Sequence, residues 1–359
     1  MKIAVFGLSI SSSWGNGHAT LWRGLCRGLH QLGHTVLFFE KDVPWYAGAR
    51  DSVEFPGCEL RLYASWDEVR QEASAALRDA DAAVVTSYCP DALAACDLVL
   101  RSAVPAKVFY DLDTPVTFSR LDAKQSVEYV PAQGLAGFDL VLSYTGGVAL
   151  DRLRRDLGAR RVLPLYGSVD PAVHRPVLPV DDFRGELSYL GTWAADRQET
   201  LEELFIVPAR HLPDRRFVIA GAQYPDSFPW TRNMYFMRHL EPALHPAFFC
   251  SSRATLNVTR RAMADMGYCP SGRLFEASSC GVPVISDVWE GIDQFYKPGD
   301  EIVLCRTSQD MLNALSMSDA EFRRIGNNAR ERTLAEHTAE RRALEFESAL
   351  EEAACSMQA

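Results

Sequence analysis

Short runs of apolar residues alternate with helical patterns along the whole chain. Residues 3–8 are almost entirely apolar, which predicts a buried strand. Leucines then recur every three or four positions across residues 17–32, which predicts a helix that Gly33 ends. A second strand-like run follows at residues 34–40. Strands that alternate with helices indicate a parallel sheet with helices on both faces.

The rest of the chain continues this alternation, with one interruption. In the first half we expect further strands at 58–63, 82–87, 107–112 and 140–144, and helices at 65–78 and 90–101. A loop rich in proline ends near Pro179, and the alternation restarts after it. In the second half we expect strands at 187–191, 217–220, 255–258, 282–286 and 301–305, helices at 198–209 and 273–280, and a long charged helical tail at 318–354. The pattern predicts two doubly wound, Rossmann-like α/β domains, at 1–178 and 179–359.

Length and composition agree with two domains and argue against some classes of protein. A chain of 359 residues fits two domains of roughly 100–200 residues each. The net charge of −10 and the lack of a long basic tract argue against nucleic acid as the main partner. The chain has neither an apolar run of about 20 residues nor a signal-peptide pattern, so we expect a cytoplasmic protein without a transmembrane segment. The nine cysteines form no metal-binding motif, so we expect reduced thiols.

The first domain offers candidate chemistry where its strands end, since open parallel sheets bind ligands beyond the carboxyl ends of their strands. Small residues between the first strand and Gly17 would let the backbone approach a nucleotide. A dinucleotide site is an alternative, because Glu40 ends the second strand, but the required tight glycine spacing is absent. His18 opens the helix and could accept a proton from an acceptor hydroxyl; a loop-ordering role is the alternative.

Two carboxylates follow the fifth strand, at Asp111 and Asp113. Residues at i and i+2 of an extended segment point to the same side, so both could bind sugar hydroxyls, orient His18 or act as a base. A turn or helix cap before Pro115 is an equally good interpretation. With His18, these aspartates are the candidate catalytic residues.

The second domain contains candidate phosphate and ribose ligands. Gly191 and Thr192 leave its first strand, and Arg197 begins the next helix, where it could clamp a diphosphate or simply be a solvated residue of the helix start. Further along, a loop that includes Ser271 and Gly272 leads into a helix. That helix carries Arg273, suited to phosphate, and Glu276, suited to the two hydroxyls of a ribose. A plain ion pair between Arg273 and Glu276 is the alternative.

The run Arg273-Leu274-Phe275-Glu276-Ala277, followed by Gly281-Val282-Pro283-Val284, resembles the second-domain signature of GT-B glycosyltransferases. It looks most like the CgeB-like, spore-maturation-type branch, which is related to the family-four glycosyltransferases. The segment around Asn257 is similar to that branch as well. Tyr268 stands where the family-four pattern has its first glutamate. The resemblance implies that Glu276 holds the ribose of a nucleotide, and that Arg273 and Ser271 hold its diphosphate.

The resemblance further implies that the two domains face one another across a cleft and that the last helix crosses back to the first domain. It implies a transfer of sugar from a nucleoside-diphosphate sugar to an unknown acceptor, without a metal or another cofactor. The expected donor or nucleotide ligands are Gly17, Gly191, Thr192, Arg197, Asn257, Tyr268, Ser271, Gly272, Arg273 and Glu276. An epimerase acting on a sugar nucleotide, a nicotinamide-dependent oxidoreductase and a non-catalytic binding protein are alternatives. Inversion and retention at the sugar carbon both stay open.

Overall fold

The computed structural model describes residues 1–15 and 17–355, and these form two compact units. Unit 1 comprises Met1–Gly167 and the segment from Ala339 onward, and unit 2 comprises Ser168–Thr338. The expected boundary at 178–179 differs because the segment after Gly167 already belongs to unit 2. There Val169 forms a β-bridge with Thr338, and the carbonyl of His174 accepts a hydrogen bond from Ser279 Oγ.

Unit 1 is built on a seven-stranded sheet in the order β3-β2-β1-β4-β5-β6-β7, in which every neighbouring pair is parallel. The order runs outward in both directions from β1 and β4, as a doubly wound fold requires. Apolar residues fill both faces of the central strands, since helices cover both. The strands are β1 (Lys2–Gly7), β2 (Thr35–Lys41), β3 (Cys58–Tyr63), β4 (Ala82–Thr86), β5 (Ala106–Asp111), β6 (Leu140–Ser143) and β7 (Val162–Pro164).

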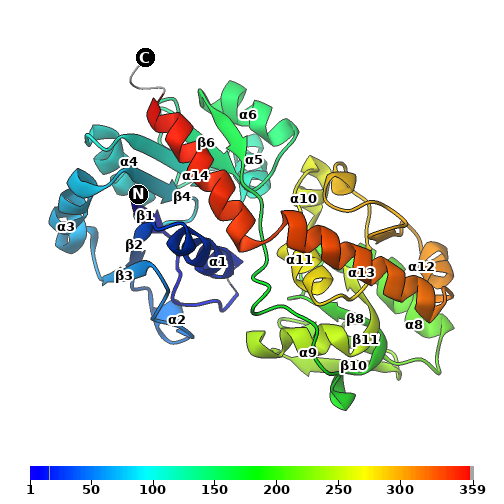
Figure 1. Cartoon of the computed structure of the whole chain (residues 1–359). Helices are drawn as coiled ribbons and strands as arrows, with labels where there is room; N and C mark the ends of the chain where they lie inside the picture. The colour runs from blue at the N-terminus through cyan, green and yellow to red at the C-terminus, as the bar shows by residue number, and fades with distance from the viewer. Residues whose placement is uncertain (16, 356–359) are drawn as a thin grey trace. The chain divides into compact units, whose positions relative to one another are not determined.

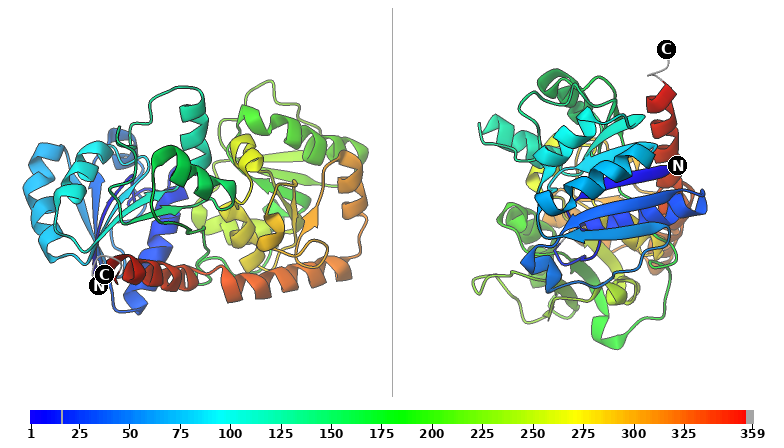
Figure 2. Two further views of the ribbon diagram at one scale, coloured as in Figure 1. Left: turned by 90° about the horizontal axis from the view of Figure 1, so that it is seen from above. Right: turned by 90° about the vertical axis from the view of Figure 1, so that its left-hand side faces the viewer.

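The helices of unit 1 include one from the far end of the chain (Figure 1). Helices α1 and α14 pack on one face of the sheet, and α3 packs on the other (Figure 2). On that other face Trp66 lies against Phe6. A Cβ atom on Gly28 of α1 would lie 2.8 Å from Ala343 Cβ of α14, so the two helices cross closely. The helices are α1 (Gly17–Gln31), α2 (Pro44–Ala47), α3 (Trp66–Asp79), α4 (Ala92–Arg101), α5 (Thr114–Asp122), α6 (Val148–Leu157) and α14 (Ala339–Cys355).

Unit 2 has a six-stranded, fully parallel sheet in the order β10-β9-β8-β11-β12-β13. Its direction reverses between β8 and β11, which is where doubly wound folds bind ligands. The strands are β8 (Gly185–Leu190), β9 (Phe217–Gly221), β10 (Met234–Arg238), β11 (Ser252–Asn257), β12 (Val284–Ser286) and β13 (Val303–Leu304). The helices are α7 (Gln198–Leu201), α8 (Val207–His211), α9 (His245–Cys250), α10 (Arg261–Met266), α11 (Gly272–Ser279), α12 (Ser308–Leu315) and α13 (Asp319–Glu336).

The structure has several short helices that were not predicted, and it differs from the prediction in one strand and in the last helical stretch. Strand β10 was not predicted; it lies at the edge of its sheet, and Tyr235 and Phe236 on it are exposed. The expected continuous tail is two helices, because α13 ends at Glu336. The next residue, His337, caps α13 and is buried, with its ring centroid 4.7 Å from that of Phe275. Over the described part of the chain, no helix combines the length and the apolar character needed to cross a membrane.

Candidate functional site

The candidate nucleotide ligands of unit 2 gather at the point where its strand order reverses. Gly191 follows the end of β8, and the segment after β11 passes through α10 into the loop that precedes α11. A Cβ atom on Gly221 would come within 2.0 Å of the Gly191 carbonyl, so the backbones after β8 and β9 are in close contact. The topology therefore brings together residues that the sequence separates widely.

Helix α11 presents Arg273 and Glu276 to this edge of the sheet. Ser271 caps the helix by accepting a hydrogen bond from the backbone N–H of Arg273 at 3.2 Å. The guanidinium of Arg273 then donates to Glu276 Oε2 at 2.7 Å. Burial would raise the pKa of the Glu276 carboxyl, but Arg273, with His174 and His245, lowers it to about 2. Glu276 is thus an ionised carboxylate, able to accept hydrogen bonds from a diol.

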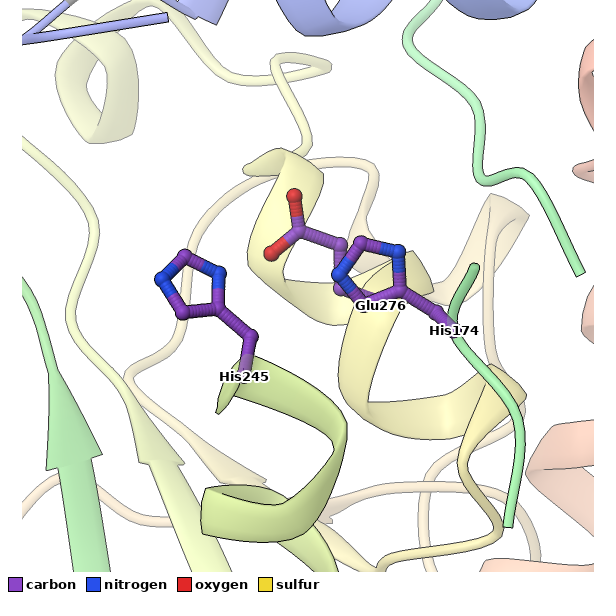
Figure 3. Close-up of side chains that lie close together, drawn as sticks. All are labelled: His174, His245 and Glu276. Atoms are coloured by element: carbon purple, nitrogen blue, oxygen red, sulfur yellow. The ribbon is translucent and has the colours of Figure 1, made fainter. Parts of the chain in front are cut away.

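Two histidines that the sequence did not single out lie beside Glu276 (Figure 3). His174 lies in the segment before β8, and His245 is the first residue of α9. Burial and the charge of Arg273 lower the pKa of His245 to about 4. Burial also lowers the pKa of His174, although the Glu276 carboxylate acts against this. Both rings are therefore neutral near pH 7. No spacing rule could have found them, because only the fold joins the two segments to α11.

Arg197 lies at the start of the helical segment after β8, as expected. One of its Nη atoms donates to the carbonyl of Thr192 at 3.1 Å. Its Nε atom is buried and has no hydrogen-bond partner among the described residues. A buried donor without a partner is costly, so a ligand oxygen would be favourable here. Gly191 is buried and Thr192 is exposed.

Three other predicted ligands of unit 2 have different surroundings. Asn257 is buried, and its amide donates to Ser286 Oγ at 2.9 Å and to Thr259, so this side chain orders the ends of β11 and β12. Tyr268 is half-buried and has a φ of 48°, in the left-handed region. Its backbone N–H donates to the carbonyl of Glu290. Gly272 is the first residue of α11, with open space for a Cβ atom up to Glu276 at 3.9 Å.

The structure of unit 1 brings two of the three candidate catalytic residues together. His18 Nε2 lies 2.7 Å from Asp113 Oδ2, and both residues are near the carboxyl ends of the strands. A carboxylate on one imidazole nitrogen orients the ring and stabilises the imidazolium that forms when the ring takes a proton. Gly17, the first residue of α1, is exposed, and a Cβ atom on it would meet no atom of the described residues within 4 Å, its chain neighbours aside.

Asp111 does not share the site of Asp113, which corrects the expectation that both point to one side. Its side chain is fully buried and accepts hydrogen bonds from Thr117 Oγ1 at 2.8 Å and from the backbone N–H of Asp113 at 3.0 Å. The chain turns into α5 directly after β5, so the two carboxylates diverge. Burial raises the pKa of Asp111 to about 6. The carboxyl group holds the turn that positions Asp113.

The loop after β1 is organised around Glu40 instead of being open to a dinucleotide. The buried Glu40 carboxylate accepts hydrogen bonds from the backbone N–H groups of Ile10 and Ser11, at 2.7 and 3.0 Å. It also accepts from the hydroxyls of Ser9 and Ser11. In a dinucleotide fold this acidic residue binds the ribose. Here its oxygens are already occupied, which agrees with the absence of the glycine fingerprint.

Comparison with protein-family models gives a match that lies mostly in unit 2. Residues 197–348 match a family model described as glycosyl transferase-like. The matched segment contains Arg197, Asn257 and the whole of α11. The chain therefore contains a glycosyltransferase-like domain. The match does not distinguish the CgeB-like branch from its relatives, so that assignment stays a prediction. No curated protein sequence matches the chain.

Solved structures resemble the whole chain in fold. Sucrose-phosphate synthase of Thermosynechococcus elongatus has a TM-score of 0.71 at 15% identity and covers 98% of both chains. HepE of Anabaena, solved with UDP and glucose, has a TM-score of 0.69 at 12% identity, over 98% of this chain and 100% of its own. AviGT4, a glycosyltransferase of avilamycin A biosynthesis, has a TM-score of 0.57 at 16% identity, over 99% and 98%. The two Rossmann-like domains are thus those of the GT-B fold, as predicted.

Proposed function

We propose that this protein is a glycosyltransferase that moves a sugar from a nucleoside-diphosphate sugar to a hydroxyl or other nucleophile of an acceptor. The observation that carries the proposal is the capped start of α11, with its Arg273–Glu276 pair, inside the glycosyl transferase-like segment. The same segment begins with Arg197, whose buried Nε has no hydrogen-bond partner in the described part of the chain. A cation and a carboxylate at the carboxyl edge of a parallel sheet suit a nucleoside diphosphate.

In this proposal the donor binds to unit 2. The Glu276 carboxylate accepts hydrogen bonds from the two ribose hydroxyls, and Arg273 turns from Glu276 to the diphosphate together with Arg197. As the bond between the sugar carbon and the diphosphate oxygen breaks, the oxygen takes the electron pair, and the two guanidinium groups stabilise its charge. This assignment needs no metal. HepE, solved with UDP-glucose, is a relative in fold with such a donor.

The acceptor is assigned to unit 1, where His18 is the proposed base. As the acceptor oxygen bonds to the sugar carbon, His18 takes its proton, and Asp113 stabilises the resulting imidazolium. The 2.7 Å contact between His18 and Asp113 supports this pairing. A histidine base fits inversion at the sugar carbon, whereas the family-four glycosyltransferases, to which the resembling branch is related, retain its configuration. The stereochemistry of the product therefore distinguishes the two.

Thermal denaturation with UDP, GDP, dTDP, CMP and NAD(H) tests the proposal. A ligand that binds the folded protein raises the unfolding midpoint, and the rise grows with the logarithm of the ligand's excess over its dissociation constant. We expect one nucleoside diphosphate to raise the midpoint. Glu276→Ala should weaken its binding about tenfold or more, because hydrogen bonds to a charged group contribute about 1.5–3 kcal/mol. Glu331→Ala, at an exposed position of α13, is the control and should bind like the wild type.

The proposal would be overturned if only NAD(H) raised the unfolding midpoint, or if a nucleoside diphosphate raised the midpoint of Glu276→Ala as much as that of the wild type. Incubation with the donor sugar nucleotide alone then separates a transferase from an epimerase. An epimerase converts the donor without an acceptor, whereas a transferase yields a glycosylated product only when an acceptor is present.

A further inference from the structure

One group of side chains in the described part of the chain has the composition and spacing of a metal site. His174, His245 and Glu276 each offer one ligand atom, and these atoms all lie within 4.8 Å of one another. They come from three separate segments of unit 2: the turn before β8, the start of α9 and the middle of α11 (Figure 3). Of these three residues, the nucleotide assignment above uses only Glu276, and it gives neither histidine a role.

We propose that His174, His245 and Glu276 bind a divalent transition metal ion such as Zn²⁺, Co²⁺ or Ni²⁺, and that the ion and the donor nucleotide exclude one another. The metal site itself stands on these three residues. The exclusion rests on the proposed function, because it requires that Glu276 also binds the ribose of the donor.

The ligand set is the first argument for this assignment. Two imidazoles and one carboxylate are typical protein ligands of zinc, and three ligands leave a position open for water. A histidine must be neutral to bind a metal, and a carboxylate must be ionised.

The surroundings of His174 are the second argument. Its side chain is only 6% exposed, and its buried Nε2 atom has no hydrogen-bond partner among residues 1–15 and 17–355. Its backbone is held in place, because the carbonyl accepts from Ser279 Oγ at 2.6 Å. A buried polar atom without a partner costs free energy that a ligand would recover. Metal–ligand bonds of about 2.0–2.2 Å require the three side chains to move closer by about an ångström.

Arg273 acts against a cation and gives the proposal a specific prediction. Its guanidinium donates to Glu276 Oε2 at 2.7 Å, so a positive charge already lies beside the proposed ligands. Like charges repel strongly in a partly buried site. Replacing Arg273 by methionine keeps the aliphatic part of the side chain and removes the charge. Arg273→Met should therefore tighten metal binding, whereas a loss of ordinary structure would weaken it.

The exclusion of the nucleotide follows from the chemistry of Glu276. In the proposed donor complex the two ribose hydroxyls take up both oxygens of this carboxylate, so an ion bound to either oxygen would occupy the place of a hydroxyl. Binding equilibria are reciprocal, so a metal that weakens nucleotide binding must itself be bound more weakly in the presence of the nucleotide. The ion would thus act as an inhibitor of donor binding.

Titration of the full chain with Co²⁺, after treatment with a chelator, tests the site. We expect one ion per chain, with visible d–d absorption and without the intense thiolate-to-cobalt band that cysteine ligands produce. His174→Ala and His245→Ala should each weaken Co²⁺ binding about tenfold or more. His211→Ala is the matched control, because that exposed histidine of α8 lies outside the group and should leave Co²⁺ binding unchanged.

Several results would overturn the proposal: no Co²⁺ binding, binding that ignores both histidine variants, or binding with a thiolate band. Thermal unfolding and circular dichroism of the metal-free variants establish that they fold. Nucleotide binding by the metal-free protein is measured separately. If UDP or another nucleoside diphosphate binds through Glu276 and Co²⁺ does not bind, only the metal site fails. If Co²⁺ binds through the histidines and no nucleotide binds, only the glycosyltransferase assignment and the exclusion fail.

Discussion

The buried carboxyl group of Asp111 should make the stability of unit 1 fall as the pH rises. Burial raises the pKa of Asp111 from 3.8 to about 6 in the folded protein. Between these two values the folded chain keeps a proton that the unfolded chain has released. The free energy of unfolding therefore decreases as the pH rises through this window, opposite to the effect of a carboxylate in an ion pair.

The size of the effect follows from the two pKa values. At about 1.36 kcal/mol per pKa unit, the difference between 3.8 and about 6 amounts to ~3 kcal/mol. About 2 kcal/mol of this falls between pH 4.5 and pH 7.5, because the unfolded chain already releases most of its proton below pH 4.5. The substitution Asp111→Asn removes the titration and keeps the shape of the side chain. The new amide can donate to Thr117 Oγ1, which can in turn donate to Tyr129 Oη.

Urea unfolding of the wild type and Asp111→Asn at pH 4.5 and pH 7.5, followed by circular dichroism, measures this contribution. We expect the variant to gain about 2 kcal/mol relative to the wild type between the two pH values. Asp79→Asn, at the exposed end of α3, is the control and should show no such gain. A difference between wild type and Asp111→Asn that is the same at both pH values would refute the reasoning.

Two further predictions concern unit 1. His18→Gln should lower the turnover number about 10²–10⁴-fold, as the loss of a general base does. Nucleotide binding, measured by thermal shift, should stay unchanged. A fall in turnover of less than about threefold would show that His18 is not the base. Gly28→Val should destabilise unit 1 by about 1–3 kcal/mol in urea unfolding, because the new Cβ atom would lie 2.8 Å from Ala343 Cβ and 2.9 Å from the Ala339 carbonyl. Thr20→Val, on the exposed side of the same helix, is the control, and an equal effect of both changes would contradict the close packing.

Much of the fold could be predicted from the sequence because buried parallel strands are nearly continuous apolar runs. Strand β3 and helix α4 differ from their predicted ranges by two residues or fewer at each end. Strand β10 was missed because its apolar run, Met234–Met237, is too short for the pattern alone to identify a strand. The division of the last helical stretch was not predicted either. In the sequence His337 is one polar residue among many, and only its packing against Phe275 in the folded protein buries it.

The candidate site was predictable where its residues are neighbours in sequence. Ser271, Arg273 and Glu276 share one cap and one helix turn, so local rules were enough to place them together. The distinct positions of Asp111 and Asp113 depend on the turn after β5, which the alternation of an extended strand does not describe. His174 and His245 could not be found at all, because the packing of α9 and the turn before β8 against α11 has no local signal.

The close crossing of α1 and α14 has a consequence for how the protein is made. The last helix supplies Ala343, Phe346 and Leu350 to the core of unit 1, but the ribosome adds it only after all of unit 2. At a synthesis rate of about 5–20 residues per second, roughly 15–60 seconds pass between the synthesis of α1 and that of α14, and the apolar face of α1 lacks its partner during this time. During translation, unit 2 can thus finish folding while unit 1 is still incomplete, and the nascent first unit should be a substrate for chaperones that bind exposed apolar helices.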